Sequence, residues 1–327
     1  MKNFSFNSWG KLILSKIPIF LFCVAFVGCY GAVFGSENSI VGVSLLTALL
    51  LFITNDFGYK AVQAAIMIPV LFLVALFAAK ISLINPYLGI VVNSLSIWCL
   101  LLFSSHNIAS GNHLPLLLGY IFFQGYDVTG DLFKMRLTSI VLISGFIGII
   151  YYLQHRKNTY RRSIKDLVLE MRLQSTRTQW YIKLTVTLTF VMFVCDLLNY
   201  PKSIWISFAV LSILQPLQVD ATHKAKHRLP ATLLATVIFY ILVAYLLPEG
   251  GITIISIVFG FVASLASSYF SKTTINTICA LCTAAMLYSV TDAIFLRIIS
   301  NTIGTLVAFL SHYIFQWHFR RYSLSEE

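Results

Sequence analysis

Charged residues are scarce in this sequence, and their scarcity excludes most soluble folds. Asp, Glu, Lys and Arg together make up 11% of the 327 residues, whereas soluble domains carry about 25%. Hydrophobic residues reach 58%, and the mean hydropathy is +0.83. Uncharged apolar runs long enough to cross a bilayer recur along the whole chain. The composition therefore predicts an all-α, polytopic membrane protein.

The sequence motifs of common enzyme classes are also missing. There is no Gly-x-x-x-x-Gly-Lys-Ser/Thr loop for a nucleotide phosphate, no His-Glu-x-x-His metal motif and no Gly-x-Ser-x-Gly turn for a nucleophile. His223 and His227 have the spacing of a helical metal pair, but Lys224, Lys226 and Arg228 alternate with them, and nearby cations disfavour a metal ion. A solvated basic loop is the better interpretation. We therefore expect no enzyme activity, no cofactor and no metal.

The apolar runs divide into two sets of six predicted transmembrane helices. The first set covers about 17–35, 39–54, 62–79, 87–104, 114–126 and 136–153, and the second covers 181–198, 203–216, 229–247, 252–270, 275–289 and 297–316. The fifth and eleventh are short enough to be half-buried or re-entrant. The predicted organisation is a membrane unit over residues 1–153, a linker over 154–180 and a second membrane unit over 181–327.

The linker has the pattern of an amphipathic helix. Ile164, Leu167, Val168 and Met171 follow the i, i+3, i+4, i+7 spacing with basic residues around them, as in helices that lie in the cytoplasmic interface of a membrane. We expect the segment to join the two units and to anchor on lipid. A regulatory or partner-docking helix is the alternative.

Basic residues are distributed unevenly between the two sides of the predicted membrane protein. All but five of the 23 lysines and arginines fall on the side of the termini and the linker. The five on the other side are Lys80, Lys134, Arg136, Lys202 and Arg297. Because cytoplasmic loops are enriched in Lys and Arg, both termini are predicted to be cytoplasmic. The net charge of +11 then favours contact with anionic lipid headgroups and not with nucleic acid.

One motif occurs twice, each time at the start of an apolar helix. Residues 126–136 (Tyr-Asp-Val-Thr-Gly-Asp-Leu-Phe-Lys-Met-Arg) resemble residues 288–297 (Tyr-Ser-Val-Thr-Asp-Ala-Ile-Phe-Leu-Arg). Internal duplication of spans is common in secondary transporters. Because each copy closes a unit with an even number of helices, the two units are predicted to be parallel repeats with a substrate cleft between them.

The repeated motif contains the first candidate site residues. Arg136 and Arg297 open the last helix of each unit, where a guanidinium can hold a carboxylate substrate with two hydrogen bonds. The alternative is structural: each arginine pairs with the acid five positions earlier, Asp131 or Asp292. The sequence leaves both interpretations open, and one residue can serve both purposes.

An acid inside an apolar helix is a further candidate. Asp196 ends the apolar stretch from Thr185 to Cys195. Ionisable residues within a membrane span are costly and usually functional, so Asp196 either carries a coupling proton or reaches the outer headgroups near Lys202. Aromatic residues at such edges are common, and Tyr126 and Tyr288 are therefore interpreted as interfacial residues, with a substrate platform as the alternative.

Three short motifs occur in a fixed order in the second half. Asn199-Tyr-Pro-Lys-Ser-Ile-Trp205 opens a helix, Leu214-Gln-Pro216 closes it, and His227-Arg228-Leu-Pro-Ala-Thr232 enters the next, before Arg297 with Gly304-Thr305. Together these motifs resemble the fusaric-acid-resistance-like, aromatic acid exporter family. The resemblance covers the second half and adds Trp205 and Arg228 to the candidate transport residues. In the first half only Arg136, Gly145 and the helix pattern correspond, and Ala231 replaces the family's usual glycine.

The resemblance implies a multi-pass protein of the bacterial inner membrane. The function we expect is secondary export of small aromatic or other organic anions, driven by an ion or by the membrane potential. Expected partners are the anion, membrane lipids and, as a possibility left open, further copies of the chain. A non-transporting subunit that organises an envelope complex through a helix at 160–179 is the alternative.

Overall fold

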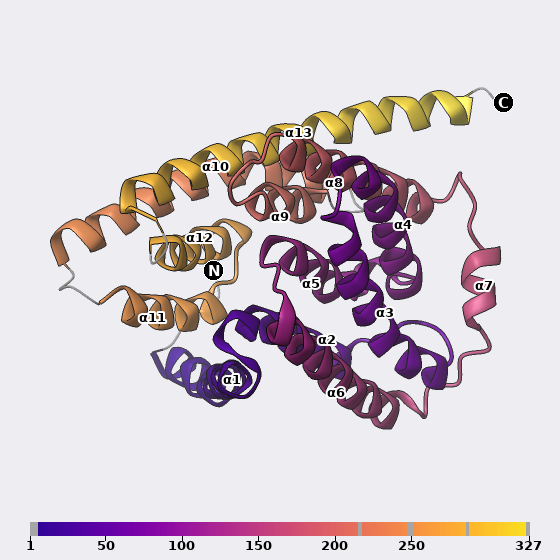
Figure 1. Ribbon diagram of the computed structural model, residues 1–327, viewed down its shortest axis with the longest axis horizontal. Helices are drawn as coiled ribbons and strands as arrows, with labels where there is room; N and C mark the ends of the chain where they lie inside the picture. The colour runs from indigo at the N-terminus through magenta and orange to yellow at the C-terminus, as the bar shows by residue number, and fades with distance from the viewer. Residues whose placement is uncertain (1–5, 215–217, 247–250, 286–287, 325–327) are drawn as a thin grey trace.

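The computed structural model describes residues 6–214, 218–246, 251–285 and 288–324. Within these ranges all regular structure is helical and no β-strand is present, as the composition predicts. The first half contains α1 (Phe6–Phe34), α2 (Ser39–Thr54), α3 (Ala61–Ser82), α4 (Pro86–Ser104), α5 (His113–Gly125) and α6 (Gly130–His155), and α7 (Ile164–Leu169) follows. The second half contains α8 (Thr176–Leu197), α9 (Ile204–Ile213), α10 (Gln218–Ile241), α11 (Ile252–Leu265), α12 (Tyr269–Ala285) and α13 (Val290–Leu324) (Figure 1).

Eight helices of the described chain are long and apolar enough to cross a membrane. They are α1, α2, α3, α4, α6, α8, α10 and α13. The helices α5, α9, α11 and α12 have 13, 10, 14 and 17 residues, fewer than the roughly 20 that a straight span needs. The sequence predicts α5 and α12 to be short; the shortness of α9 and α11 is an additional finding. The chain is a multi-pass membrane protein, and twelve complete spans remain a prediction.

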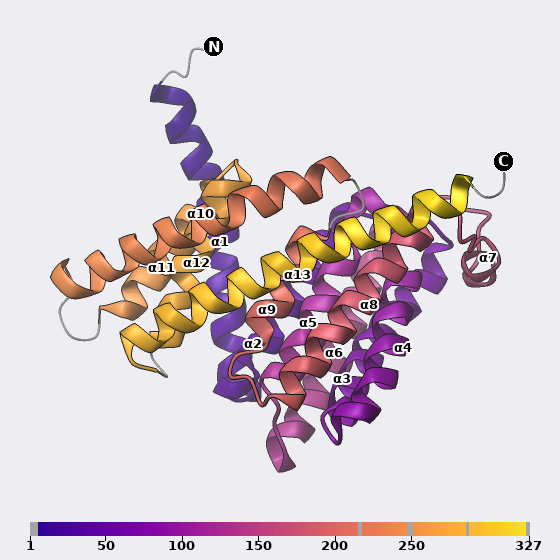
Figure 2. The same ribbon diagram turned by 90° about the horizontal axis from the view of Figure 1, so that it is seen from above.

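The helices pack as two groups that meet along several pairs (Figures 1 and 2). In the first half α3 contacts α4, α5 and α6, while in the second half α10 contacts α12 and α13, and α13 contacts α9. The halves meet where α4 packs on α8, α5 on α9 and α1 on α11. Tyr181 of α8 strengthens the first of these contacts, because its hydroxyl donates to the Ser105 carbonyl, 2.8 Å away, just beyond α4.

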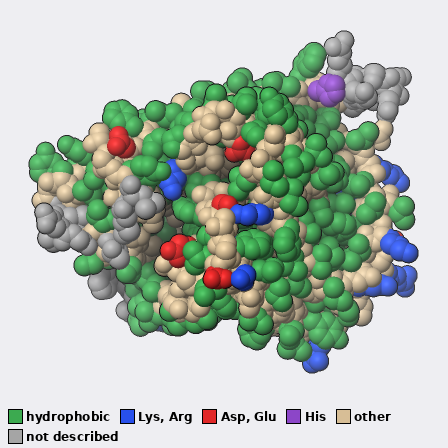
Figure 3. Space-filling model, in the orientation of Figure 1, with side chains coloured by type: hydrophobic (Ala, Val, Ile, Leu, Met, Phe, Trp, Pro, Cys, Tyr) green, Lys and Arg blue, Asp and Glu red, His purple; other side chains and the backbone are tan. Residues whose placement is uncertain are grey.

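The outer surface of the bundle is mostly hydrophobic. Large apolar side chains such as Leu142, Phe190 and Leu306 are more than half exposed, which is expected where helices face lipid. Figure 3 shows this hydrophobic face and shows lysines and arginines at the edge where α7 lies. The distribution agrees with the charge asymmetry of the sequence.

The linker differs from its prediction, because its helix is only six residues long. Ser163 and Asp166 form a capping box at the start of α7, which accounts for where the helix begins. Leu167 is 1% exposed, and α7 contacts α4. The Ile164 amide also donates to the Gln63 side chain at the start of α3, 3.0 Å away. The apolar residues of α7 therefore pack partly on the protein's own helices, and a continuous interfacial helix over the linker is not present.

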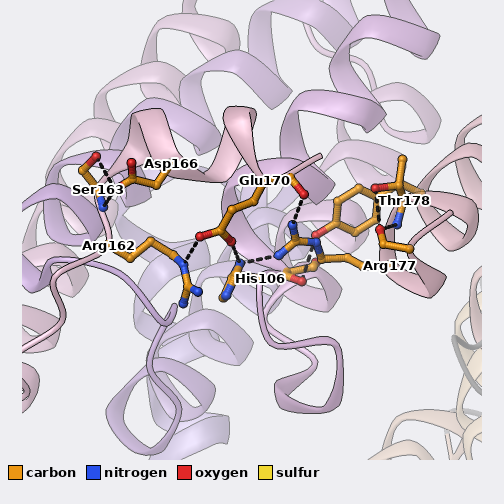
Figure 4. Close-up of polar contacts among 10 residues, drawn as sticks. His106, Arg162, Ser163, Asp166, Glu170, Arg177 and Thr178 are labelled. Carbon is orange, nitrogen blue, oxygen red and sulfur yellow. Dashed lines mark hydrogen bonds and ion pairs between the residues drawn. The ribbon is translucent and has the colours of Figure 1, made fainter. Parts of the chain in front are cut away.

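A polar cluster holds the linker in place (Figure 4). Arg162 Nε donates to Glu170 Oε1 at 2.8 Å, and Glu170 Oε2 lies 4.0 Å from His106 Nδ1 in the loop after α4. Arg177 Nη1 donates to the same nitrogen of His106, which must therefore be unprotonated. Burial, together with the Arg162 and Arg177 charges, lowers the pKa of His106 to about 4, although Glu170 acts to raise it.

The docking of α7 is expected to weaken as the pH falls from about 6.5 to about 4. His106 has an ordinary pKa of 6.5 and a lowered pKa of about 4 when the linker is docked, so the undocked state takes up the proton first within that window. Hydrogen exchange of the α7 amides, corrected for intrinsic rates, should accelerate in this range and stay constant above it. His106→Gln should remove the pH dependence; a variant that keeps it would show that another group is responsible.

The basic segment before Pro230 is helical, which corrects the predicted loop. α10 begins at Gln218, so Lys224, Lys226 and Arg228 lie in its first turns. The rings of His223 and His227 lie 4.3 Å apart on this helix. Groups of three or more potential metal ligands do not occur among the described residues.

Close contact between α6 and α3 depends on one glycine. A Cβ added at Gly148 would lie 2.5 Å from the Ala65 carbonyl oxygen, whereas a Cβ at Gly145 of the same helix would meet nothing within 4 Å. Gly148→Ala is therefore expected to destabilise the fold by about 1 to 3 kcal/mol through overpacking. Gly145→Ala, the matched control, should be neutral or slightly stabilising because alanine favours helix. Thermal unfolding in detergent compares the two; equal melting temperatures would contradict the close approach.

Candidate functional site

Arg297 is a buried arginine of α13 that lies against a buried tryptophan of α9. Its guanidinium carbon is 5.0 Å from the centre of the Trp205 ring, the residue is 7% exposed, and its Nε has no hydrogen-bond partner among the described residues. Gly304 allows this contact between the helices, because a Cβ there would lie 2.5 Å from the Ala209 Cβ. A guanidinium that stacks through its face keeps its edge available for an anion.

Arg228 is a second buried arginine and comes from α10. Its Nε donates to Asn301 Oδ1 at 3.0 Å, and its Nη1 donates to the hydroxyls of Ser212 and Tyr269, the latter at 3.2 Å. These partners come from α13, α9 and the start of α12, so Arg228 is held by three helices. All of these contacts are to neutral groups.

The two guanidinium groups lie near one another, and no acid among the described side chains neutralises them. Arg228 is close enough to act electrostatically on Arg297. Asn301 links them, since it accepts from Arg228 and donates its Nδ2 to the Arg297 carbonyl at 3.0 Å. Neither arginine takes part in an ion pair in the described part of the chain. Two buried, uncompensated cations are unfavourable in a membrane protein, and a bound anion would compensate them.

Arg136 occupies a different environment in the first half. Its Nε donates to Asn38 Oδ1 and its Nη1 donates to the Tyr126 carbonyl, both at 2.8 Å. The residue is 1% exposed, and only Nη2 lacks a partner among the described groups. Arg136 thus connects the start of α6 to the start of α2 and the end of α5. The geometry gives it a structural role beside any role in transport.

The structural pairing proposed for the repeated motif does not form. Asp131 is exposed and lies 2.8 Å from Lys134, while Asp292 is exposed and accepts from the Ser289 hydroxyl at 2.7 Å. Both acids lie in the first turn of a helix, where a carboxylate interacts favourably with the free amides and the helix dipole. Asp131 and Asp292 therefore have the positions of helix-start residues, and the arginines five positions later turn inward without them.

Asp196 lies elsewhere, near a polar group of the first half. It is half-buried at the end of α8 and acts electrostatically on Tyr120 of α5. The Tyr120 hydroxyl donates to Asn93 Oδ1, and Gln124 Nε2 donates to the same oxygen at 2.6 Å. This arrangement combines an acid with a buried hydrogen-bond network, which suits a proton-carrying group.

The two copies of the motif converge on Lys202, which the sequence did not reveal. The Lys202 ammonium lies 4.9 Å from the centre of the Tyr126 ring and 5.7 Å from that of Tyr288. Burial lowers its pKa, and its backbone has a left-handed φ of 57°, which is uncommon for a lysine. Lys202 precedes Trp205 by one turn, so a cation between two tyrosines lies close to the Arg297 site.

Two asparagines were also missed as partners of the arginines. Asn38 and Asn301 accept from Arg136 and Arg228, and both are fully buried. A polar amide within an apolar stretch was the available signal, because such a residue is rare in a span unless it has a partner.

The fold and these residues define a class: a multi-pass membrane protein whose second half buries two arginines that pair with no acid in the part of the chain that the structure describes. The family described as fusaric acid resistance protein-like has a model that matches residues 189–311. This match confirms the resemblance seen in the sequence and includes Trp205, Arg228 and Arg297. No curated protein and no solved structure matches the chain.

Proposed function

We propose that the protein exports small aromatic or other organic anions across the bacterial cytoplasmic membrane. The observation that carries this proposal is the pair of buried guanidinium groups, Arg297 against the Trp205 ring and Arg228 near it, with no ion pair to an acid among the described residues. The carboxylate of the substrate lies at the guanidinium edges and its ring lies against aromatic side chains. An anion fits because it supplies the missing negative charge.

The membrane potential is sufficient to drive such export. Moving one elementary negative charge outward across 100 mV, with the inside negative, releases about 2.3 kcal/mol. No nucleotide-binding motif is needed for this step. A proton carried by Asp196 is an additional source of energy in this proposal.

The packing of the helices supports an arrangement of two parallel six-helix repeats. The contacts of α3 with α5 and α6 correspond to those of α10 with α12 and α13, and α1 with α2 corresponds to α8 with α9. Between the halves, α4 contacts α8 and α11 contacts α1, as expected for two related units, whereas the contact of α5 with α9 has no comparable counterpart between α12 and α2 in the described chain. In this proposal the termini are cytoplasmic and one half moves against the other to expose the anion.

The alternative of a non-transporting scaffold subunit has less support. It depended on a helix over 160–179, of which α7 (Ile164–Leu169) and the start of α8 are the helical parts. Leu167, at the centre of α7, is buried within the chain, whereas Val168 and Leu169 of the same helix are 46% and 79% exposed, so only part of this surface is occupied. We favour transport because the buried arginines of the second half suit an anion.

Potential-driven flux in liposomes tests the proposal. Purified protein is reconstituted, a potassium diffusion potential is imposed, and the movement of radiolabelled benzoate, phthalate and benzenesulfonate is followed. We expect a flux of these anions that requires the protein and reverses with the sign of the potential. A neutral amide such as benzamide should cross no faster than in protein-free liposomes. If none of the three anions moves faster than in protein-free liposomes, the proposal is wrong.

A further inference from the structure

One face of α13 carries buried polar atoms that have no hydrogen-bond partner among the residues that the structure describes. They are Arg297 Nε, Thr305 Oγ1 and His312 Nδ1, on residues that are 7%, 5% and 4% exposed. At 100° per residue these side chains lie within about 80° of one another around the helix axis. Asn301, which binds Arg228, lies on the same face between them.

The opposite face of α13 is apolar and exposed. Ile299, Leu306 and Leu310 are 45%, 53% and 58% exposed, as expected for side chains that face lipid. The distinction between the two faces is therefore clear along the helix. From Arg297 to His312 the polar face extends about 22 Å, at 1.5 Å per residue, which is most of the thickness of a bilayer core.

A further cation lies at the His312 end of this face. Lys183 of α8 is 8% exposed and is close enough to His312 to act on it electrostatically. It has no ion pair with any acid of the described chain. The polar face thus has Lys183 at one end, and Arg297 with Arg228, which binds Asn301 one turn further along α13, at the other.

Buried polar atoms without partners need water or a ligand. Leaving one such group unpaired destabilises the fold, so three on one helix face indicate a hydrated or occupied space and not ordinary packing. Because the described charged groups beside this face, Lys183, Arg228 and Arg297, are all positive, the species that fits it is an anion.

We propose that the α13 face formed by Arg297, Asn301, Thr305 and His312, with Lys183 of α8, lines the path of the anion through the second half. The anion moves between Lys183 at one end and the Arg297–Trp205 site at the other. This proposal rests on the proposed export function, but its principal test measures water access and does not require transport.

Cysteine accessibility tests the path. In a variant whose six cysteines are replaced, Thr305→Cys is compared with Leu306→Cys, its neighbour on the exposed apolar face, using the anionic reagent sulfonatoethyl methanethiosulfonate. Because only a hydrated thiol ionises and reacts, Thr305→Cys should react about tenfold faster than Leu306→Cys, or more. Ala308→Cys, on the same buried face, provides a second position should Thr305→Cys fail to fold. Equal rates on both faces, or no reaction at 305 and 308 in folded protein, would overturn the proposal.

A charge substitution separates this path from the exporter function itself. Lys183→Met should reduce the flux of benzoate in liposomes about tenfold, while Lys165→Met, an exposed lysine of α7, leaves it unchanged. Unchanged flux in Lys183→Met would remove Lys183 from the path. Labelling of Thr305→Cys with no flux of any anion in wild type would instead contradict the export function and leave the hydrated face in place.

Discussion

Asn301→Asp is expected to weaken anion binding strongly and to stabilise the fold. The substitution places a carboxylate where the Asn301 amide now accepts from Arg228 Nε at 3.0 Å, one helical turn after Arg297 on α13. An internal carboxylate would form a charge-assisted hydrogen bond with Arg228 and supply the negative charge that the substrate anion otherwise brings. The gain is offset in part because the bond from Asn301 Nδ2 to the Arg297 carbonyl is lost.

The expected effect on binding is large because a buried charge left without its partner costs about 3 to 5 kcal/mol, and the internal carboxylate removes that cost before the substrate binds. Affinity for benzoate should fall by about a hundredfold or more, and the melting temperature should rise by several degrees. Asn38→Asp is the matched control, since Asn38 accepts from Arg136 in the first half; it should leave benzoate affinity unchanged. An Asn301→Asp variant that binds benzoate with wild-type affinity would contradict the proposed anion site.

Arg297→Lys is expected to lose substrate affinity even though it retains the charge. Lysine lacks the planar fork that both stacks on Trp205 and presents two donors to a carboxylate, so binding should weaken by roughly 1 to 3 kcal/mol, about tenfold or more. Arg297→Ala should lose at least as much. The measurement is tolerance to aromatic acids in cells that express wild type, Arg297→Lys and Arg297→Ala at equal levels. Wild-type tolerance in both variants would remove Arg297 from the site and shift attention to Arg228 and Asp196.

The helices were largely predictable because hydrophobic length is a local property of the sequence. Each of the predicted apolar ranges overlaps a helix, and the starts of α6 and α13 coincide with the repeated motif. The residues at which the helices begin and end were less predictable. α10 continues through its basic segment because Lys and Arg are good helix formers, and α7 is short because Ser163 and Asp166 cap it and Glu170 ends it.

The candidate site was predictable only where a motif marked it. Trp205, Arg228 and Arg297 belong to motifs of the second half, and the structure places Arg297 against Trp205 and within electrostatic range of Arg228. Asn301 belongs to no motif, and its role depends on α10 and α13 lying side by side. Lys202 likewise meets the two tyrosines through contacts between segments far apart in sequence. Such contacts are set by tertiary packing, which a single sequence does not specify.

The central claim is that buried guanidinium groups in the second half bind an organic anion, and calorimetric titration of purified wild-type protein tests it most directly. Benzoate, phenylacetate and cinnamate are each compared with the neutral amide of the same shape at constant pH and salt. The account predicts saturable binding of at least one carboxylate, with its amide weaker by about tenfold or more because a neutral group leaves both cations uncompensated. Equal affinity for acid and amide, or no binding of any carboxylate, would contradict it.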